Sequence, residues 1–235
     1  MLIDLDDTII SAYHNPGAVW LEVATEFVTD LGGMTADTVA SAIVTSADAF
    51  WADPERGRAW RPLLFAARRE VVRLAFESVV AAGGPAIPGD VRWAIADRFS
   101  SLREERCSPF PGALEALHEL QEAGLLLALI TNGGGETQRA KLARFGLERF
   151  FHHIQIEGEH GFGKPEERAY RHAMASLGVE PGDTWMVGDN LEWEVAAPQR
   201  LGIFGVWHDH AGAGLPAGSR VKPDRIIRTL PELLE

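Results

Sequence analysis

Short apolar runs alternate with segments of helical periodicity over residues 1–8 and again from about residue 109 onward. The run at 125–130 is apolar on both faces, as a central parallel strand must be. Further apolar runs lie at His153–Ile156, Thr184–Val187, Ile203–Trp207 and Arg225–Ile227. Helical spacing fills the intervals at 112–123, 135–145, 165–177 and 190–201. Strands that alternate with single helices predict the α/β class, with a doubly wound, Rossmann-like parallel sheet.

Residues 14–106 follow a different pattern, in which apolar side chains recur at helical spacing and no convincing strand is found. Four stretches show this spacing, at 20–31, 39–50, 64–74 and 95–102. Glycine-rich breaks such as Gly83-Gly84-Pro85 separate some of them. We therefore expect an α/β core made of residues 1–13 and 107–235, with a four-helix-bundle cap domain of residues 14–106 inserted after the first strand.

Composition and charge exclude several classes of partner and of stabilising bond. The formal net charge of −12 argues against nucleic acid and anionic membranes, because both favour basic surfaces. Cys107 is the only cysteine, so neither a disulfide framework nor a thiolate metal cluster is expected. No apolar run approaches the roughly 20 residues of a spanning helix, and the short start leaves no room for a signal peptide. A cytoplasmic globular protein is expected.

Polar residues whose side chains could act in one reaction follow four of the expected strands. Ligands of open parallel sheets bind beyond the carboxyl ends of the strands, where the strand order reverses. The residues at these ends are Asp4 and Asp6, then Thr131, Asn132 and Gly133, then Lys164 within Gly-Lys-Pro, and finally Asp189 with Glu192 and Glu194. We expect them to converge on one site.

This set of side chains suits phosphoryl transfer. One carboxylate can attack phosphorus to form an acyl phosphate, and a second can protonate the leaving oxygen and then activate water. Lys164, the Thr131 hydroxyl and the backbone N–H groups around Asn132 and Gly133 can hold the transferred group. The hard oxygen ligands of Asp4 and Asp189 favour Mg²⁺ over zinc or copper.

The four motifs, in this order, resemble those of the haloacid dehalogenase superfamily of hydrolases. The matching residues are Asp4, Asp6 and Thr8 of Asp-x-Asp-x-Thr, Thr131 at the end of the second strand, Lys164, and Gly188-Asp189 with Glu194. The helical insert is similar to the cap that many members place after the first motif. The resemblance covers the whole core.

The resemblance implies a role for each residue of the site. Asp4 is then the nucleophile, Asp6 the general acid and base, and Thr8 a support for the loop after the first strand. Mg²⁺ is expected to be held by Asp4, the backbone carbonyl of Asp6 and Asp189. Glu194 stands where many members carry Asp, and we expect it to reach the ion through water or to orient Asp189.

These expectations describe a Mg²⁺-dependent phosphatase of a small phosphorylated metabolite, active as a monomer or homodimer through an aspartyl phosphate. Asp6 favours phosphate esters, because members that resemble the dehalogenases lack a second Asp and halide departure needs no protonation. The alternatives are a phosphomutase, a 2-haloacid dehalogenase and a non-catalytic binding protein. The substrate is not encoded in the motifs, because specificity lies in cap loops that share no code.

Several other polar groups are expected to have no catalytic role. Five cap arginines near Trp51 and Trp60 are interpreted as a solvated, ion-paired helix face: Arg56, Arg58, Arg61, Arg68 and Arg69. His208-Asp209-His210 follows an expected strand but lacks a third ligand at suitable spacing. His152, His153 and His160 are expected in loops and receive no role.

Overall fold

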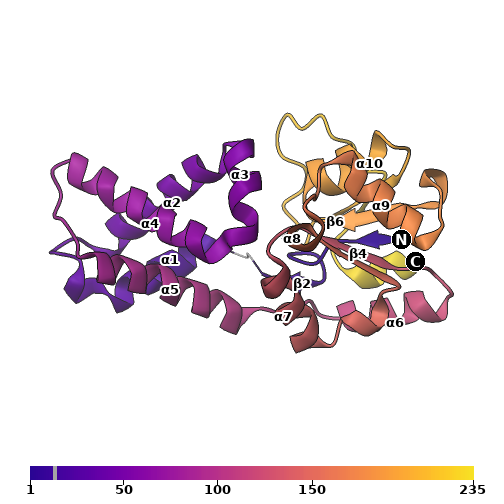
Figure 1. Cartoon of the computed structure of the whole chain (residues 1–235), viewed down its shortest axis with the longest axis horizontal. Coiled ribbons are helices and arrows are strands. Elements are labelled where there is room, and N and C mark those ends of the chain that lie inside the picture. The colour runs from indigo at the N-terminus through magenta and orange to yellow at the C-terminus, as the bar shows by residue number, and fades with distance from the viewer. Residues whose placement is uncertain (13–14) are drawn as a thin grey trace. The chain divides into compact units, whose positions relative to one another are not determined.

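The computed structural model describes residues 1–12 and 15–235 of the chain (Figure 1). The chain divides into two compact units. The first contains residues 1–12 and 108–235, and the second lies between them and ends at Cys107. The domain boundary expected between residues 13 and 14 lies outside the described residues.

Six parallel strands form the sheet of the first unit. They are β1 (Leu2–Ile3), β4 (Ala128–Thr131), β5 (His153–Ile156), β6 (Trp185–Gly188), β7 (Phe204–His208) and β8 (Arg225–Ile227). Their order is β5-β4-β1-β6-β7-β8. The chain runs outward from β1 to β5 and then returns to the other side of β1, so the order reverses beside the end of β1. The predicted doubly wound α/β fold is confirmed.

Helices cover both faces of this sheet, with α9 and α10 on one face and α6 and α7 on the other (Figure 1). Their bounds are α6 (Ala113–Glu122), α7 (Gly135–Phe145), α8 (Glu157–His160), α9 (Glu167–Leu177) and α10 (Ala197–Gln199). Shorter turns are η3 (Glu148–Phe150), η4 (Pro181–Asp183) and η6 (Leu230–Leu234). The side chains of Tyr170, Ala173 and Met174 from α9 pack with those of β1, β4 and β6 in one apolar cluster. This packing fixes the sheet that presents the motifs.

Two elements differ from the expected pattern. The strand expected at 125–130 begins only at Ala128, because Leu125 belongs to the turn that ends α6 and its N–H donates to the Leu120 carbonyl. The helix expected at 190–201 is a π-helical segment, η5 (Leu191–Ala196), followed by α10. Pro198 has no N–H to donate to the Glu194 carbonyl, so the hydrogen-bond pattern of an α-helix is interrupted before α10.

A two-stranded antiparallel ribbon, not expected from the sequence, joins the two segments that lead into and out of the second unit. It pairs β2 (Ile10–Ser11) with β3 (Ser108–Pro109). The Phe110 N–H extends the pairing by donating to the Ile9 carbonyl at 2.9 Å. The ribbon therefore fixes the path of the chain immediately after the first motif.

The second unit is helical, and its described residues contain no strand. Its helices are α1 (Pro16–Glu26), α2 (Ala36–Trp51), α3 (Pro54–Trp60), α4 (Leu64–Ala81) and α5 (Gly89–Arg106), with η1 (Val28–Asp30) and η2 (Arg61–Leu63). The Trp20 and Phe99 rings stack in its core, with centroids 3.5 Å apart. The short helix α3 adds to the four expected helical stretches, and Asp53 caps its start by accepting the N–H groups of Glu55 and Arg56.

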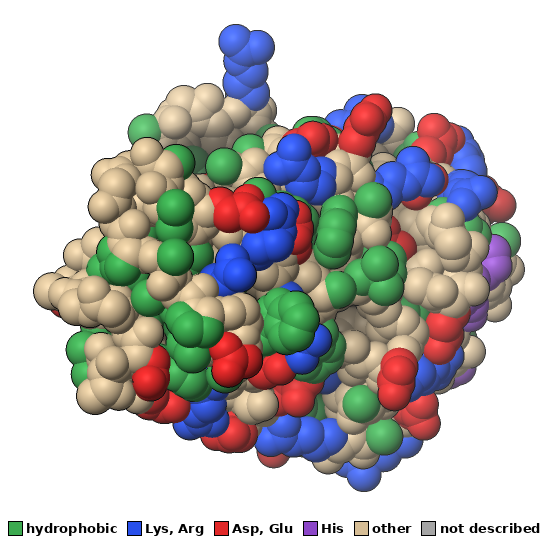
Figure 2. All heavy atoms as spheres, turned by 60° about the vertical axis from the view of Figure 1, so that its left-hand side comes forward, with side chains coloured by type: hydrophobic (Ala, Val, Ile, Leu, Met, Phe, Trp, Pro, Cys, Tyr) green, Lys and Arg blue, Asp and Glu red, His purple; other side chains and the backbone are tan. Residues whose placement is uncertain are grey.

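The cap arginines interact within the second unit. Arg69 forms a two-point ion pair with Asp97, at 2.8 and 2.5 Å, and Arg56 lies 3.6 Å from Asp53. Arg68 instead is buried, with its guanidinium over the Phe99 ring. Figure 2 shows acidic and basic side chains interspersed over the face that it presents. No helix in the described part of the chain is long and apolar enough to cross a membrane.

Replacing Leu2 by alanine tests the position of β1 in the sheet. Leu2 is fully buried between β4 and β6, so Leu2→Ala is expected to lower the free energy of unfolding by about 2–5 kcal/mol. Leu125→Ala is the matched control and is expected to cost within about 0.5 kcal/mol, since Leu125 is 38% exposed. Urea titration measures both values, and equal losses would contradict the late start of β4.

Candidate active site

The first motif occupies a tight loop at the carboxyl end of β1. The Asp4 N–H donates to the Val187 carbonyl of β6 at 3.0 Å, which anchors Asp4 at the carboxyl end of β1. The N–H groups of Thr8, Ile9 and Ile10 all donate to the Leu5 carbonyl. This turn brings the buried Thr8 hydroxyl to 3.1 Å from Asp4 Oδ2, to which it donates. Thr8 therefore holds the Asp4 side chain as well as the loop.

The other oxygen of Asp4 faces a buried ammonium group. Lys164 Nζ lies 2.5 Å from Asp4 Oδ1 and 2.7 Å from Glu194 Oε1, and both Lys164 and Glu194 are 1% exposed. Burial disfavours the charged ammonium, but the charges of Asp4 and Glu194 outweigh it and raise the pKa of Lys164. Lys164 therefore keeps its positive charge throughout the physiological pH range.

Carboxyl groups outnumber ammonium groups around this lysine. Burial, reinforced by the charges of Glu194 and Asp4, raises the pKa of Asp189 to about 9. Burial also raises the pKa of Glu194 to about 7 and raises that of Asp4, although the Lys164 ammonium opposes both changes. Three carboxyl groups thus surround one ammonium, and a further cation would favour their charged forms.

Glu194 links the loop after β6 to Lys164. Its Oε2 accepts the Asn190 N–H at 2.7 Å, while its Oε1 meets the lysine. Any side chain at Gly188 would collide with that of Glu194, so this contact requires glycine there. The sequence suggested a contact with the metal through water or with Asp189. The structure gives Glu194 a direct contact with Lys164, and its expected contact with the metal or Asp189 stays a prediction.

The loop after β4 positions Lys164 through its backbone. The Asn132 side chain accepts the Lys164 N–H at 2.8 Å and donates to the Lys164 carbonyl at 2.7 Å. The Gly133 N–H donates to Glu157 Oε2 at 3.1 Å. Thr131 is buried, and its hydroxyl accepts from Gln138 Nε2 at 2.6 Å. The Gly133 N–H has a protein partner here, and phosphate binding by the backbone of Asn132 and Gly133 stays a prediction.

Two residues of α7 that the sequence did not single out hold the second carboxylate. Lys141 Nζ lies 2.6 Å from Asp6 Oδ1, and Gln138 Nε2 donates to Asp6 Oδ2 at 2.9 Å. Their separation of three residues places them on one side of α7, which begins just after the Thr131 loop. The spacing of these two polar residues in the sequence indicates a shared polar face of the helix. Only the fold shows that this face of α7 contacts Asp6.

The His208-Asp209-His210 segment has a structural role. Both ring nitrogens of the buried His208 face backbone carbonyls, those of Asp7 and Arg228, at 3.0 and 3.1 Å. The Asp209 carboxylate accepts the N–H groups of Ala213 and Gly214. These contacts tie the first motif to the loop after β7, and in His208 and Asp209 they occupy the atoms that would bind a metal.

Comparisons with known proteins identify the family of this chain. The profile of haloacid dehalogenase-like hydrolases matches residues 1–202. A phosphoserine phosphatase of Thermus thermophilus is 36% identical over 187 residues, which are 79% of this chain and 66% of that protein. A glyceraldehyde 3-phosphate phosphatase of Pyrococcus furiosus is 32% identical over 139 residues, or 59% and 56% of the two chains. The matches thus span between about half and two thirds of these relatives.

Solved structures share the fold over almost the entire chain. The HAD hydrolase YfnB of Bacillus subtilis, described as bound to magnesium, has a TM-score of 0.72 at 25% identity, with 99% of this chain and 95% of that chain covered. A HAD phosphatase of Thermococcus onnurineus has a TM-score of 0.67 at 22% identity, with 99% and 94% covered, and shows the fold alone. Because the family profile covers most of the sequence, the chain belongs to the haloacid dehalogenase-like hydrolase family.

Proposed function

We propose that this protein is a Mg²⁺-dependent phosphatase of small phosphomonoesters, with Asp4 as the nucleophile. One observation carries the proposal. The two oxygens of a buried carboxylate are held by Thr8 and Lys164, and a second carboxylate, Asp6, is held two residues away by other partners. A nucleophile and a separate proton carrier are what hydrolysis through an acyl phosphate requires. The named phosphatases among the relatives support the same reaction.

The chemistry of the donor groups supports Mg²⁺ as the cofactor. Asp4 and Asp189 offer hard oxygen ligands, and burial disfavours their charged forms in the absence of a cation. We assign the ion to Asp4, the backbone carbonyl of Asp6 and Asp189, with Glu194 behind them. When bound, the ion supplies positive charge that offsets the repulsion between a carboxylate and a phosphate.

Each residue of the site then has a separate role in the reaction. Asp4 attacks phosphorus while Asp6 gives a proton to the departing alkoxide, which leaves an aspartyl phosphate. Asp6 next takes a proton from water, whose oxygen attacks phosphorus and frees inorganic phosphate and the Asp4 carboxylate. Lys164 and Thr131 bind oxygens of the transferred group. Lys141 and Gln138 keep the Asp6 carboxylate in position between the two proton transfers.

The substrate class follows from the leaving group that needs a proton. Phosphoserine and glyceraldehyde 3-phosphate, named in two relatives, both carry phosphate on a primary alcohol. A primary alkoxide is strongly basic and leaves only when it is protonated, which matches the role given to Asp6. We therefore propose a small metabolite phosphorylated on a primary hydroxyl as the substrate.

Removing the nucleophile is expected to abolish turnover. Asp4→Asn should lower kcat by at least about 10³-fold, because no other group can form the acyl phosphate. Phosphate release from a panel of about a hundred phosphorylated metabolites in Mg²⁺ measures the effect. The panel includes phosphoserine and glyceraldehyde 3-phosphate.

The matched control for this change is Asp7→Asn, which is expected to keep most of the activity. Asp7 accepts the Ala12 N–H and has a left-handed φ of 58°, and asparagine can reproduce both features. Wild-type turnover by Asp4→Asn would contradict the mechanism. An isomerised product from a bisphosphate, without free phosphate, would instead identify a phosphomutase.

Replacing the proton carrier is expected to separate the two steps of the reaction. Asp6→Asn should slow hydrolysis of an alkyl phosphate by about 10²–10⁴-fold, because the alkoxide cannot be protonated. With p-nitrophenyl phosphate the leaving group needs no proton, so the variant should release one equivalent of nitrophenol rapidly and then turn over slowly. Stopped-flow absorbance measures this burst, and equal losses for both esters without a burst would argue against two proton transfers by Asp6.

The contribution of Asp189 to the stability of the metal-free protein is expected to fall as pH rises. The pKa of Asp189 is about 9 in the folded protein and ordinarily 3.8, so the folded state binds more protons between these values. The contribution of Asp189 to the free energy of unfolding therefore decreases with rising pH, and Asp189→Asn should remove this contribution between about pH 5 and pH 8. Thermal melts in EDTA measure it, with the exposed Asp183→Asn as control.

Mg²⁺ should raise Tm most at high pH, and less in Asp189→Asn than in the wild type. A variant that keeps both the wild-type pH slope and the full Mg²⁺ effect would remove Asp189 from the metal site.

A further inference from the structure

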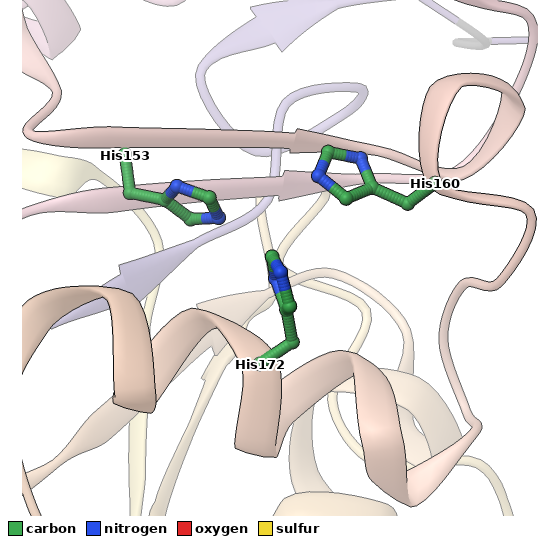
Figure 3. A group of neighbouring side chains, drawn as sticks. All are labelled: His153, His160 and His172. Atoms are coloured by element: carbon green, nitrogen blue, oxygen red, sulfur yellow. The ribbon is translucent and has the colours of Figure 1, made fainter.

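Three histidines from separate elements meet at the edge of the sheet, two strands away from β1. His153 begins β5, His160 ends α8 and His172 lies in α9 (Figure 3). One ring nitrogen from each lies within 4.8 Å of those from the other two. The sequence gave no role to His153 and His160 and did not single out His172, which lies twelve residues further on. The fold alone brings the three rings together.

Hydrogen bonds fix the ring orientation of two of these histidines. His160 Nδ1 lies 3.1 Å from the Ile156 carbonyl, and His172 Nδ1 lies 2.8 Å from Gln155 Oε1. Both partners are acceptors, so Nδ1 carries the proton in the neutral ring and Nε2 keeps a lone pair. The orientation of the Gln155 amide follows from its other end, where Nε2 donates to the Ala169 carbonyl. Metal-binding histidines are held by bonds of this kind.

The third ring has an unsatisfied nitrogen. His153 Nε2 is buried and has no hydrogen-bond partner among the described residues. Its ring lies beside that of His172, with centroids 5.3 Å apart. A buried polar atom without a partner costs free energy, and a bound ion would supply that partner.

We propose that His153, His160 and His172 bind a divalent transition-metal ion, with Zn²⁺ as the ion of choice and a fourth position left to water. Neutral imidazoles suit Zn²⁺, whereas Mg²⁺ prefers oxygen ligands, so this site and the carboxylate site select different ions. Zinc–nitrogen bonds of about 2.0–2.1 Å place tetrahedral ligands roughly 3.4 Å apart. Small rotations of the rings close the present spacing, which extends to 4.8 Å.

The surroundings accept a cation. The Phe162 ring packs beside His160 and His172, with centroids 5.7 and 5.6 Å away, and forms an apolar wall. Arg168 stacks on the Phe162 ring and lies 3.5 Å from Glu166, so its charge is offset. Glu159, next to His160, forms an ion pair with Arg139.

A metal ion here would act as a clamp on the segment that leads to Lys164. It would join α8 to β5 and α9, three elements that otherwise meet through hydrogen bonds and packing. The first residue of α8, Glu157, accepts the Gly133 N–H of the loop after β4. Lys164 follows only four residues after His160. We therefore assign the ion a structural role in holding this segment.

Calorimetric titration of the full chain, without a histidine tag, tests the site directly. Zn²⁺ is added in excess Mg²⁺, which fills the carboxylate site. We expect one Zn²⁺ per chain and a Zn²⁺-dependent rise in Tm. His172→Ala and His160→Ala should each weaken binding by at least about tenfold, since even indirect partners of metal ligands cost that much. His172 is exposed, so its variant keeps the core intact.

The control variant is His118→Ala, because His118 is exposed and lies on α6 beside Glu122. It should bind Zn²⁺ like the wild type. Co²⁺ provides a second readout, since a nitrogen-rich tetrahedral site gives strong visible ligand-field bands that His172→Ala should abolish. Absence of Zn²⁺ binding would overturn the proposal. Binding that survives both histidine variants and disappears in Asp189→Asn would also overturn it, by assigning the ion to the carboxylates.

Discussion

The candidate site depends on one buried ammonium group. Lys164 Nζ lies between Asp4 and Glu194, and both it and Glu194 are almost fully removed from solvent. A buried charge is stable only when it is paired and hydrogen-bonded, so the lysine and the two carboxylates must be assembled together. The surrounding structure supplies that assembly. The Asn132 side chain hydrogen-bonds the Lys164 backbone, and the Asp4 N–H donates to β6. The Asn190 N–H donates to Glu194.

The same arrangement places three carboxyl groups around one ammonium group, and this imbalance connects the fold to the proposed reaction. A phosphatase of this kind must bring a phosphate dianion against a carboxylate. The two repel unless cations intervene. One cation is built into the chain as Lys164, and the raised pKa values of Asp4 and Asp189 reflect the need for another. Stability and catalysis therefore make opposite demands on these side chains, which is common at active sites.

The sequence predicted those parts of the site that local order along the chain determines. Asp4, Thr131 and Asp189 follow buried apolar runs, and parallel strands bring such ends together. It started the second strand three residues too early, because Leu125 is apolar although its N–H bonds back to the Leu120 carbonyl at the end of α6. Gln138 and Lys141 were missed because helix periodicity does not tell which element a polar face will meet. The histidine cluster was missed for the same reason, since its members come from β5, α8 and α9.

The β2–β3 ribbon has a consequence for how such proteins can change. The two ends of the helical insert leave the first unit as neighbouring antiparallel strands, which lie about 5 Å apart. A turn of two residues can bridge such a gap, and so can an insert of any size. Insertions at this stem therefore leave the register of the parallel sheet unchanged. The helical unit can be lengthened, exchanged or lost while Asp4 and Asp6 stay in place.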